Sequence, residues 1–278
     1  MLTQAEKGVA FEALHKRDGT FIIPNPWDAG TARLLAHLGF EALATTSAGY
    51  AFSVGKADNA VGRDGTLAHA TAVAAATDLP LSIDLENGFG DAPASVAETI
   101  RAAMATGAVG GSIEDSTGRH DDPIYERTLA VERIRAAADV VSRFPFPFML
   151  TARAENYLVG RPDLKDTIER LQAYQEAGAD VLYAPGLSSK SDIAAVVSSV
   201  DRPVNVLMGL QGVKITLAEL AEIGVKRVSV GSGLARCALG AFLRAATEMR
   251  EEGTFSFAED ATPYRTINSI FSSWDASH

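Results

Sequence analysis

Carboxylates that could hold a metal ion follow two β-rich segments of the chain. They are Asp84, Glu86 and Glu114. Alternation along an extended strand places Asp84 and Glu86 on one side and Leu85 on the other. Crowded carboxylates repel one another unless a cation or a shared proton relieves them, and oxygen ligands favour a hard cation. These residues therefore predict a Mg²⁺ or Mn²⁺ site, although helix caps and ion pairs at a rim use the same residue types.

Groups that could bind an anion lie close by in the sequence. Arg153 ends a third β-rich segment and suits a substrate carboxylate held by two parallel hydrogen bonds, or else an ion pair with Glu155 or Glu114. Further hydroxyl and backbone N–H donors are expected from Thr45, Thr46, Ser47, the stretch around Gly49, and the turn at residues 231–233.

Histidine and cysteine add little to this chemistry. The five histidines show no spacing typical of metal ligands; they are His15, His37, His69, His120 and His278. Only His120 falls in a loop near the acidic segments, where it is either a solvated residue or a mobile acid or base. The single cysteine, Cys237, excludes an intrachain disulfide and a multi-cysteine zinc site, and we expect it to pack inside the last long helix.

The elements that carry these residues alternate between strand and helix. The expected strands cover residues 21–25, 42–48, 80–86, 110–115, 148–153, 180–185, 204–209 and 227–231. The expected helices cover residues 29–38, 66–77, 93–106, 124–141, 163–177, 192–200, 217–223 and 234–251. Several strands are nearly continuous apolar runs, as in a parallel sheet buried on both faces. Eight such units predict a (β/α)₈ barrel; the rival doubly wound sheet lacks its GxGxxG fingerprint.

Composition narrows the class of protein. The 278 residues carry a formal net charge of −10 with a sequence pI near 5.0, which disfavours binding to nucleic acid or to anionic membranes. Hydrophobic residues at 47% and charged residues at 22% predict a folded core. No apolar stretch reaches the ~18 residues of a membrane span, and the N-terminus shows no export signal. We therefore expect a cytoplasmic protein with a small-molecule partner.

No low-complexity linker divides the chain, so we expect one barrel domain over residues 1–278 with a tail from about residue 253. The tail is rich in aromatic residues, namely Phe255, Phe257, Tyr264, Phe271 and Trp274. It either folds onto its own barrel or forms an arm that packs on a neighbouring subunit, since exposed aromatic residues tend to mark interfaces.

Several motifs together resemble the isocitrate lyase/phosphoenolpyruvate mutase superfamily, and specifically its short bacterial members. The matching pieces are PNPWDAGTARLL, TTSAGYAFSVGKADN, DLENGFG, SIEDS and TARAENYL, which lie between about Phe21 and Met249. The run from Asp84 to Gly90 resembles the family's acidic DxDxGxG metal loop, with Glu86 in the second acidic place.

The resemblance implies a (β/α)₈ barrel whose last helix is swapped between the subunits of a dimer or tetramer. It implies that Asp84 holds Mg²⁺ directly and that Glu86 and Glu114 act largely through metal-bound water. Arg153 would bind the carboxylate of a 2-oxoacid, with Thr46, Ser47 and Ala48 donating further hydrogen bonds. Asp58 aligns with the aspartate that faces the reacting group.

Departures from the family pattern bear on the reaction. Isocitrate and methylisocitrate lyases share a KKCGH loop whose cysteine serves as the acid, but residues 112–123 here read SIEDSTGRHDDP. Ser116 also stands where the mutases and phosphonopyruvate hydrolases carry lysine; Arg119 and His120 are the remaining basic groups of this loop.

A loop without the lyase acid favours a departing group that needs no proton, such as CO₂. The first hypothesis is therefore a Mg²⁺-dependent lyase or decarboxylase that cleaves a C–C bond of an oxaloacetate-like 2-oxoacid through an enolate. One alternative is P–C chemistry, as a phosphonopyruvate hydrolase or phosphoenolpyruvate phosphomutase, with Asp58 near the phosphorus. The other is a non-catalytic protein that binds 2-oxoacids.

Overall fold

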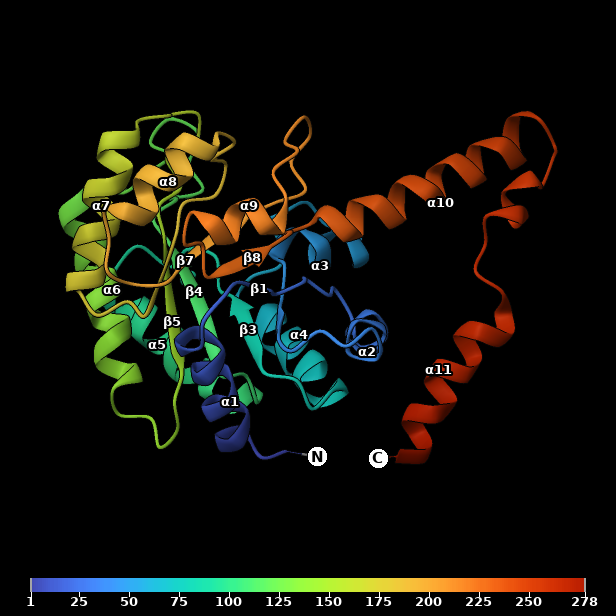
Figure 1. Ribbon diagram of the computed structural model, residues 1–278, viewed down its shortest axis with the longest axis horizontal. Helices are drawn as coiled ribbons and strands as arrows, with labels where there is room; N and C mark the ends of the chain where they lie inside the picture. Colours follow the sequence, from blue (N-terminus) through green and yellow to red (C-terminus); the bar gives the residue numbers. More distant parts are fainter. Residues whose placement is uncertain (1, 278) are drawn as a thin grey trace.

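The computed structural model describes residues 2–277, with side chains described up to residue 274. Eight parallel strands form one curled sheet in the order β1-β8-β7-β6-β5-β4-β3-β2 (Figure 1). They are β1 (Phe21–Ile22), β2 (Leu43–Ala44), β3 (Leu81–Asp84), β4 (Gly110–Glu114), β5 (Met149–Arg153), β6 (Val181–Tyr183), β7 (Val204–Leu207) and β8 (Arg227–Ser229). A hydrogen bond from the Ala44 N–H to the Pro24 carbonyl (3.1 Å) links the chain at β1 and β2. The expected (β/α)₈ barrel is confirmed.

Helices alternate with the strands around the outside of the sheet (Figure 1). They are α1 (Gln4–Lys16), α2 (Ala29–His37), α3 (Ser47–Ser53), α4 (Arg63–Ala76), α5 (Pro93–Ala103), α6 (Arg127–Val141), α7 (Leu164–Glu176), α8 (Lys190–Ser198), α9 (Leu217–Glu222), α10 (Gly233–Glu251) and α11 (Tyr264–Ser277). The short 3₁₀ segments are Met104–Thr106 and Ser256–Glu259. Within residues 2–277 no helix is long and apolar enough to cross a membrane.

Two apolar clusters hold the barrel. The larger one lies between the strands and the surrounding helices, where residues such as Leu85, Ile113 and Leu150 are fully buried. The smaller one joins Phe11 and Leu14 of α1 to residues at the starts of the strands, such as Phe21. Because α1 closes the N-terminal end of the barrel, only the C-terminal end is left for a ligand to enter.

Most of the helix after β8 does not pack against its own barrel. α10 projects away from the barrel, and α11 runs back towards it and contacts α2 (Figure 1). As a result Cys237, expected to be buried inside this helix, is exposed. The tail meets its own barrel at α2, where the Arg33 guanidinium lies 5.5 Å from the Trp274 ring centroid, whereas Phe255 and Tyr264 are exposed.

Candidate active site

Arg153, the last residue of β5, is surrounded by three carboxylates. Its Nη1 lies 3.0 Å from Asp84 Oδ1, its Nη2 lies 3.0 Å from Glu114 Oε2, and its Nε lies 2.9 Å from Glu155 Oε1. The sequence suggested two roles for Arg153, ion pairing and binding of a substrate carboxylate. Both have a structural basis, because Arg153 forms ion pairs and also lines a cavity. A guanidinium has five N–H donors, so two of them remain for a ligand.

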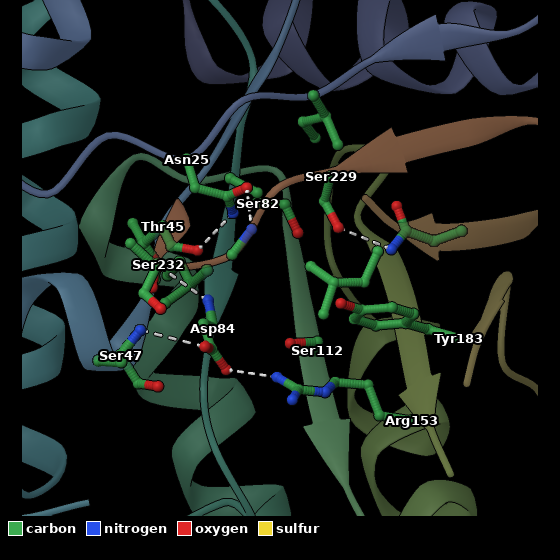
Figure 2. Close-up of a pocket in the computed structure, with 18 of the residues that line it drawn as sticks. Asn25, Thr45, Ser47, Ser82, Asp84, Ser112, Arg153, Tyr183, Ser229 and Ser232 are labelled. Carbon is green, nitrogen blue, oxygen red and sulfur yellow. Dashed lines mark hydrogen bonds and ion pairs between the residues drawn. The ribbon is translucent and has the colours of Figure 1, made fainter. Parts of the chain in front are cut away.

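Asp84 is held from three sides at the end of β3 (Figure 2). Its Oδ2 accepts a hydrogen bond from the Ser47 N–H (3.1 Å), and its own N–H donates to the Thr45 hydroxyl (2.8 Å). The Ser47 N–H is free to do this because Ser47 begins α3 and has no intrahelical partner. Thr46 is the N-cap of that helix, and its hydroxyl accepts from the Gly49 N–H (3.2 Å).

Glu86 lies just beyond the end of β3, in a left-handed backbone conformation (φ 50°). A non-glycine residue in this region is strained, and such residues gather at functional sites. Burial raises the pKa of Glu86 to about 7, and the negative charges of Asp84 and Asp58 add to this effect while Arg153 opposes it. Burial also raises the pKa of Glu114 well above its usual value, despite its contact with Arg153.

The expected site residues line two neighbouring cavities rather than one. The inner cavity, about 180 Å³, is lined by Asp58, Asp84, Arg153, Thr46, Ser47 and Ala48. The outer one, about 790 Å³, is lined by Glu86, Glu114 and the chain around Gly62 and Phe89. We refer to the part of the inner cavity around Asp58, Asp84, Arg153 and Ser47 as the mouth.

Asn25 and Tyr183 line the inner cavity but were not predicted as site residues from the sequence. Asn25 joins three strand ends, since its Nδ2 donates to the Thr45 carbonyl (3.0 Å) and its Oδ1 accepts from the N–H groups of Val230 and Gly231 (2.9 Å each). The Tyr183 ring centroid lies 5.2 Å from the Arg153 guanidinium carbon. A polar residue directly after an apolar strand, as in the FIIPN segment, is the signal that points to Asn25.

Asp115, next to Glu114, faces the opposite side of the barrel wall. Its Oδ2 accepts hydrogen bonds from Arg170 of α7 (3.1 Å) and from the Tyr174 hydroxyl (2.5 Å). Its Oδ1 accepts from the Glu155 N–H (2.8 Å). Asp115 therefore supports the site from outside, because Glu155 in turn binds Arg153.

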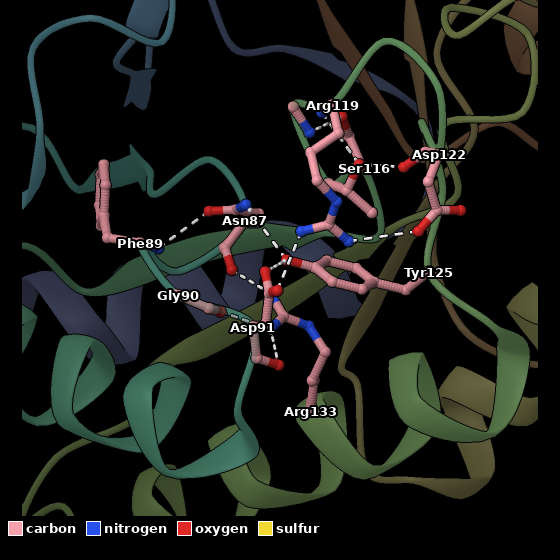
Figure 3. A network of polar contacts seen from close by, with 11 residues as sticks. Asn87, Phe89, Gly90, Asp91, Ser116, Arg119, Asp122, Tyr125 and Arg133 are labelled. Atoms are coloured by element: carbon pink, nitrogen blue, oxygen red, sulfur yellow. Dashed lines mark hydrogen bonds and ion pairs between the residues drawn. The ribbon is translucent and has the colours of Figure 1, made fainter.

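The loop after β4 is held by polar contacts to Asp91 rather than by contacts to the residues of the mouth (Figure 3). Arg119 binds Asp91 (2.9 Å) and Asp122 (3.4 Å), and the Tyr125 hydroxyl also donates to Asp91 (2.6 Å). The charge of Arg119 is thus directed to Asp91 rather than to the carboxylates around Arg153. His120 is exposed.

The site residues fit a hydrated divalent cation. No three His, Cys, Asp or Glu side chains in the described part of the chain form a ready-made metal site. Mg²⁺, however, usually keeps several waters and takes one or two protein carboxylates. Asp84 offers such a carboxylate, and Glu86 and Glu114 lie in the adjoining cavity. The repulsion by Asp84 and Asp58, which adds to the effect of burial in raising the pKa of Glu86, is what a cation at this place would relieve.

A parallel eight-stranded barrel with an arginine and several carboxylates at the C-terminal strand ends is the arrangement of a (β/α)₈-barrel enzyme. The model of the phosphoenolpyruvate phosphomutase family matches residues 11–250. The chain belongs to this family, within the isocitrate lyase/phosphoenolpyruvate mutase superfamily.

Individual relatives agree with this assignment. A crystal structure of a candidate lyase/mutase from Burkholderia cenocepacia J2315 is 66% identical, with a TM-score of 0.94 and 96% of each chain covered. The 2-methylisocitrate lyase of Escherichia coli K12 is 30% identical over 205 residues, which are 71% of this chain and 68% of that protein. Oxaloacetate acetylhydrolase, solved with its product oxalate, is 26% identical with a TM-score of 0.87, covering 99% of this chain and 96% of the other.

Proposed function

We propose that the protein is a Mg²⁺-dependent enzyme that cleaves a C–C bond at the carbon next to the carbonyl of a small, oxaloacetate-like 2-oxoacid. The observation that carries this proposal is the contact of Arg153 with Asp84 and Glu114 at the mouth of a cavity. It places anion-binding donors beside carboxylates suited to a cation. Relatives named as 2-methylisocitrate lyase and oxaloacetate acetylhydrolase support the same class of reaction.

The residues of the mouth divide the work of binding and orientation. The two remaining N–H groups of Arg153, together with the hydroxyls of Thr46 and Ser47 and the N–H of Ala48, bind the substrate carboxylate. Holding that carboxylate still keeps the bond to be broken perpendicular to the carbonyl plane. Asp84 would hold the cation, with Glu86 and Glu114 binding its waters. When bound, the cation would stabilise the negative charge that develops on the carbonyl oxygen.

The loop after β4 favours a leaving group that takes no proton. Residues 116–123 contain neither lysine nor cysteine, and Arg119 is engaged by Asp91 and Asp122. Without a lysine or cysteine on this loop, departure of CO₂ is easier than departure of a carbanion, because CO₂ leaves without being protonated. The enolate that remains takes its proton at C3 from water. This argument favours decarboxylation of an oxaloacetate-like acid.

The test is pyruvate release from oxaloacetate and from phosphonopyruvate, measured side by side with Mg²⁺ against the rate without enzyme. EDTA is the metal control, and Mn²⁺ replaces Mg²⁺ in a parallel series. Asp91→Asn is the matched variant for Asp84→Asn, since it removes a carboxylate outside the cavity. Release from oxaloacetate alone, lost in Asp84→Asn and in EDTA, is the expected result.

P–C bond chemistry is the second candidate, because Asp58 lines the inner cavity together with Asp84 and Arg153. Pyruvate release from phosphonopyruvate alone would move the proposal to a phosphonopyruvate hydrolase, and conversion of phosphonopyruvate to phosphoenolpyruvate without pyruvate would move it to a phosphomutase. Tight binding of 2-oxoacids without any product would identify a binding protein that has lost turnover.

We also propose that the chain forms a homo-oligomer through α10. Its large apolar residues Leu239, Phe242, Leu243 and Met249 are exposed, Phe242 by 66%. A helix with such a stripe gains stability by packing against another chain, which fits the swapped helix expected from the resemblance. Light scattering is expected to give a dimer or tetramer, and Phe242→Glu a smaller species; a wild-type monomer at micromolar concentration would contradict this.

A further inference from the structure

A second buried arginine lies deeper in the barrel. Arg227 begins β8 and is 4% exposed, and it lines the same inner cavity as Arg153. We refer to the part of the cavity formed by Arg227, Asn205, Ser82 and Ser112 as the floor. Below it α1 closes the barrel, and His15 of that helix touches Arg227.

The partners of Arg227 are all neutral. Its Nε donates to Asn205 Oδ1 (2.8 Å), its Nη2 to the Thr151 hydroxyl (3.1 Å), and its Nη1 faces His15 Nε2 (3.4 Å). The other ring nitrogen of His15, Nδ1, lies 2.8 Å from the Phe11 carbonyl. Since that nitrogen must carry the proton, Nε2 presents a lone pair to Arg227.

The floor therefore holds an unbalanced positive charge. Burial lowers the pKa of His15 to about 3, so the imidazole is uncharged at neutral pH. Burial lowers the pKa of Arg227 to about 10, which leaves the guanidinium charged. Within residues 2–274, whose side chains the structure describes, no carboxylate pairs with Arg227. A buried charge without a counter-charge is costly, and two of its five N–H donors remain unused.

The residues around this charge are unusual for a barrel interior. The layers inside a (β/α)₈ barrel are commonly filled by branched aliphatic side chains. Here the strands contribute Ser82, Ser112 and Asn205 to the cavity lining and Thr151 to the contacts of Arg227. The hydroxyls of Ser82 and Ser112 point into the cavity (Figure 2). Small hydroxyl residues leave space and offer hydrogen bonds, which a packed aliphatic layer does not.

We infer that Arg227 and the hydroxyl-lined floor form a second anion subsite, which takes the distal carboxylate of a small dicarboxylate. In naming the ligand this inference rests on the proposed function: the mouth binds the 2-oxoacid end, and the floor binds the other end. The subsite makes Arg227 a residue that selects dicarboxylates over monocarboxylates of the same head group.

The experiment compares matched ligand pairs that differ in the second carboxylate. Isothermal titration calorimetry with Mg²⁺ compares lactate with malate and 2-oxobutyrate with 2-oxoglutarate, and pyruvate serves as a further monocarboxylate. Wild-type protein is expected to prefer the dicarboxylates. Arg227→Met is expected to weaken their binding about 10- to 100-fold, the size of a lost charge-assisted contact, while the monocarboxylate affinities stay within about twofold. Arg101→Met, on the exposed face of α5, controls for the change in net charge.

Loss of fold is separated from loss of the subsite by two readouts. Unchanged binding of pyruvate by Arg227→Met shows that the mouth is intact, and Arg227→Lys, which keeps the charge, is expected to retain part of the preference. Equal weakening of both ligands in a pair, no weakening, or no preference in the wild type would each overturn the inference. A preference lost in Arg227→Met with no pyruvate released from oxaloacetate would remove the proposed function and leave the subsite standing.

Discussion

The mouth and the floor of one cavity each contain a buried arginine, yet their surroundings are opposite. Arg153 contacts three carboxylates, whereas Arg227 contacts an amide, a hydroxyl and a neutral imidazole. Although burial alone would lower the pKa of Arg153, Glu155, Glu114 and Asp84 raise it well above its usual value. The mouth thus has surplus negative charge and the floor surplus positive charge, so that one end suits a cation and the other an anion.

The largest expected effect is a difference in unfolding free energy between variants of the two arginines. Arg153→Met leaves buried carboxylates without a partner and is expected to lower the free energy of unfolding by about 3–5 kcal/mol. Arg227→Met leaves only neutral groups without a partner, so the free energy of unfolding is expected to fall by about 1–3 kcal/mol. Urea unfolding in metal-free buffer measures both. A larger loss for Arg227→Met would mean that the charge contrast is not what distinguishes the two regions.

A test of the mouth alone uses Asp84. Asp84→Asn keeps the size of the side chain but removes a charge beside Arg153, and the proposed reaction is expected to lose about 10²–10³-fold in kcat/KM. The control Asp91→Asn should stay within about threefold, because Asp91 binds Arg119 and Tyr125 outside the inner cavity. Similar losses in the two variants would argue against a special role for Asp84.

The neutral state of His15, which lies below the floor, predicts a pH dependence. The pKa of His15 is about 3 in the folded protein and about 6.5 in an unfolded chain, so below pH 6.5 the unfolded chain binds the proton more readily. The contribution of His15 to stability is complete above pH 6.5 and is lost towards pH 3, by at most about 1.4 kcal/mol per pH unit. His15→Gln is expected to reduce this acid slope relative to wild type in thermal or urea unfolding. Parallel slopes for the two proteins would rule out the assignment.

The smallest effect is expected at the loop outside both regions. The Arg119–Asp91 pair is largely exposed, at 42% and 61% for the two side chains, and exposed pairs contribute at most about 1 kcal/mol. Arg119→Ala should therefore change the unfolding free energy by less than that amount and leave pyruvate binding unchanged. A strong loss of binding would show that Arg119 reaches the mouth after all.

Much of the fold could be predicted from the sequence because a parallel barrel has a strong periodic signal. The expected strand at residues 110–115 corresponds to β4 (Gly110–Glu114), and the one at residues 148–153 corresponds to β5 (Met149–Arg153). The seven-residue helix α3 was missed, since its glycine and the threonine run before it favour loop or strand. The direction of α10 was not predictable either, because an amphipathic pattern does not say which chain covers its apolar face.

The site divides in the same way. Asp84, Glu114 and Arg153 were predicted as site residues because they end β-rich segments. The structure places Arg153 in contact with the other two. Arg227 escaped notice because it starts a three-residue strand buried throughout. A period of two cannot tell which face of such a strand points inward, nor can it show that the neighbouring side chains carry no charge.

The contacts of Asp115 behind the site offer a way for the substrate preference of this barrel to change. Arg170 and Asp166 of the outer helix α7 are joined by an ion pair (2.7 Å). Arg170 also donates a hydrogen bond to Asp115, which in turn accepts one from the Glu155 N–H. The orientation of Glu155, and through it the position of Arg153, is therefore set partly by residues that no ligand touches. Substitutions at Arg170 or Asp166 of α7 can tune the mouth while its own residues stay the same, which gives the barrel a route to new substrates that leaves the catalytic cluster intact.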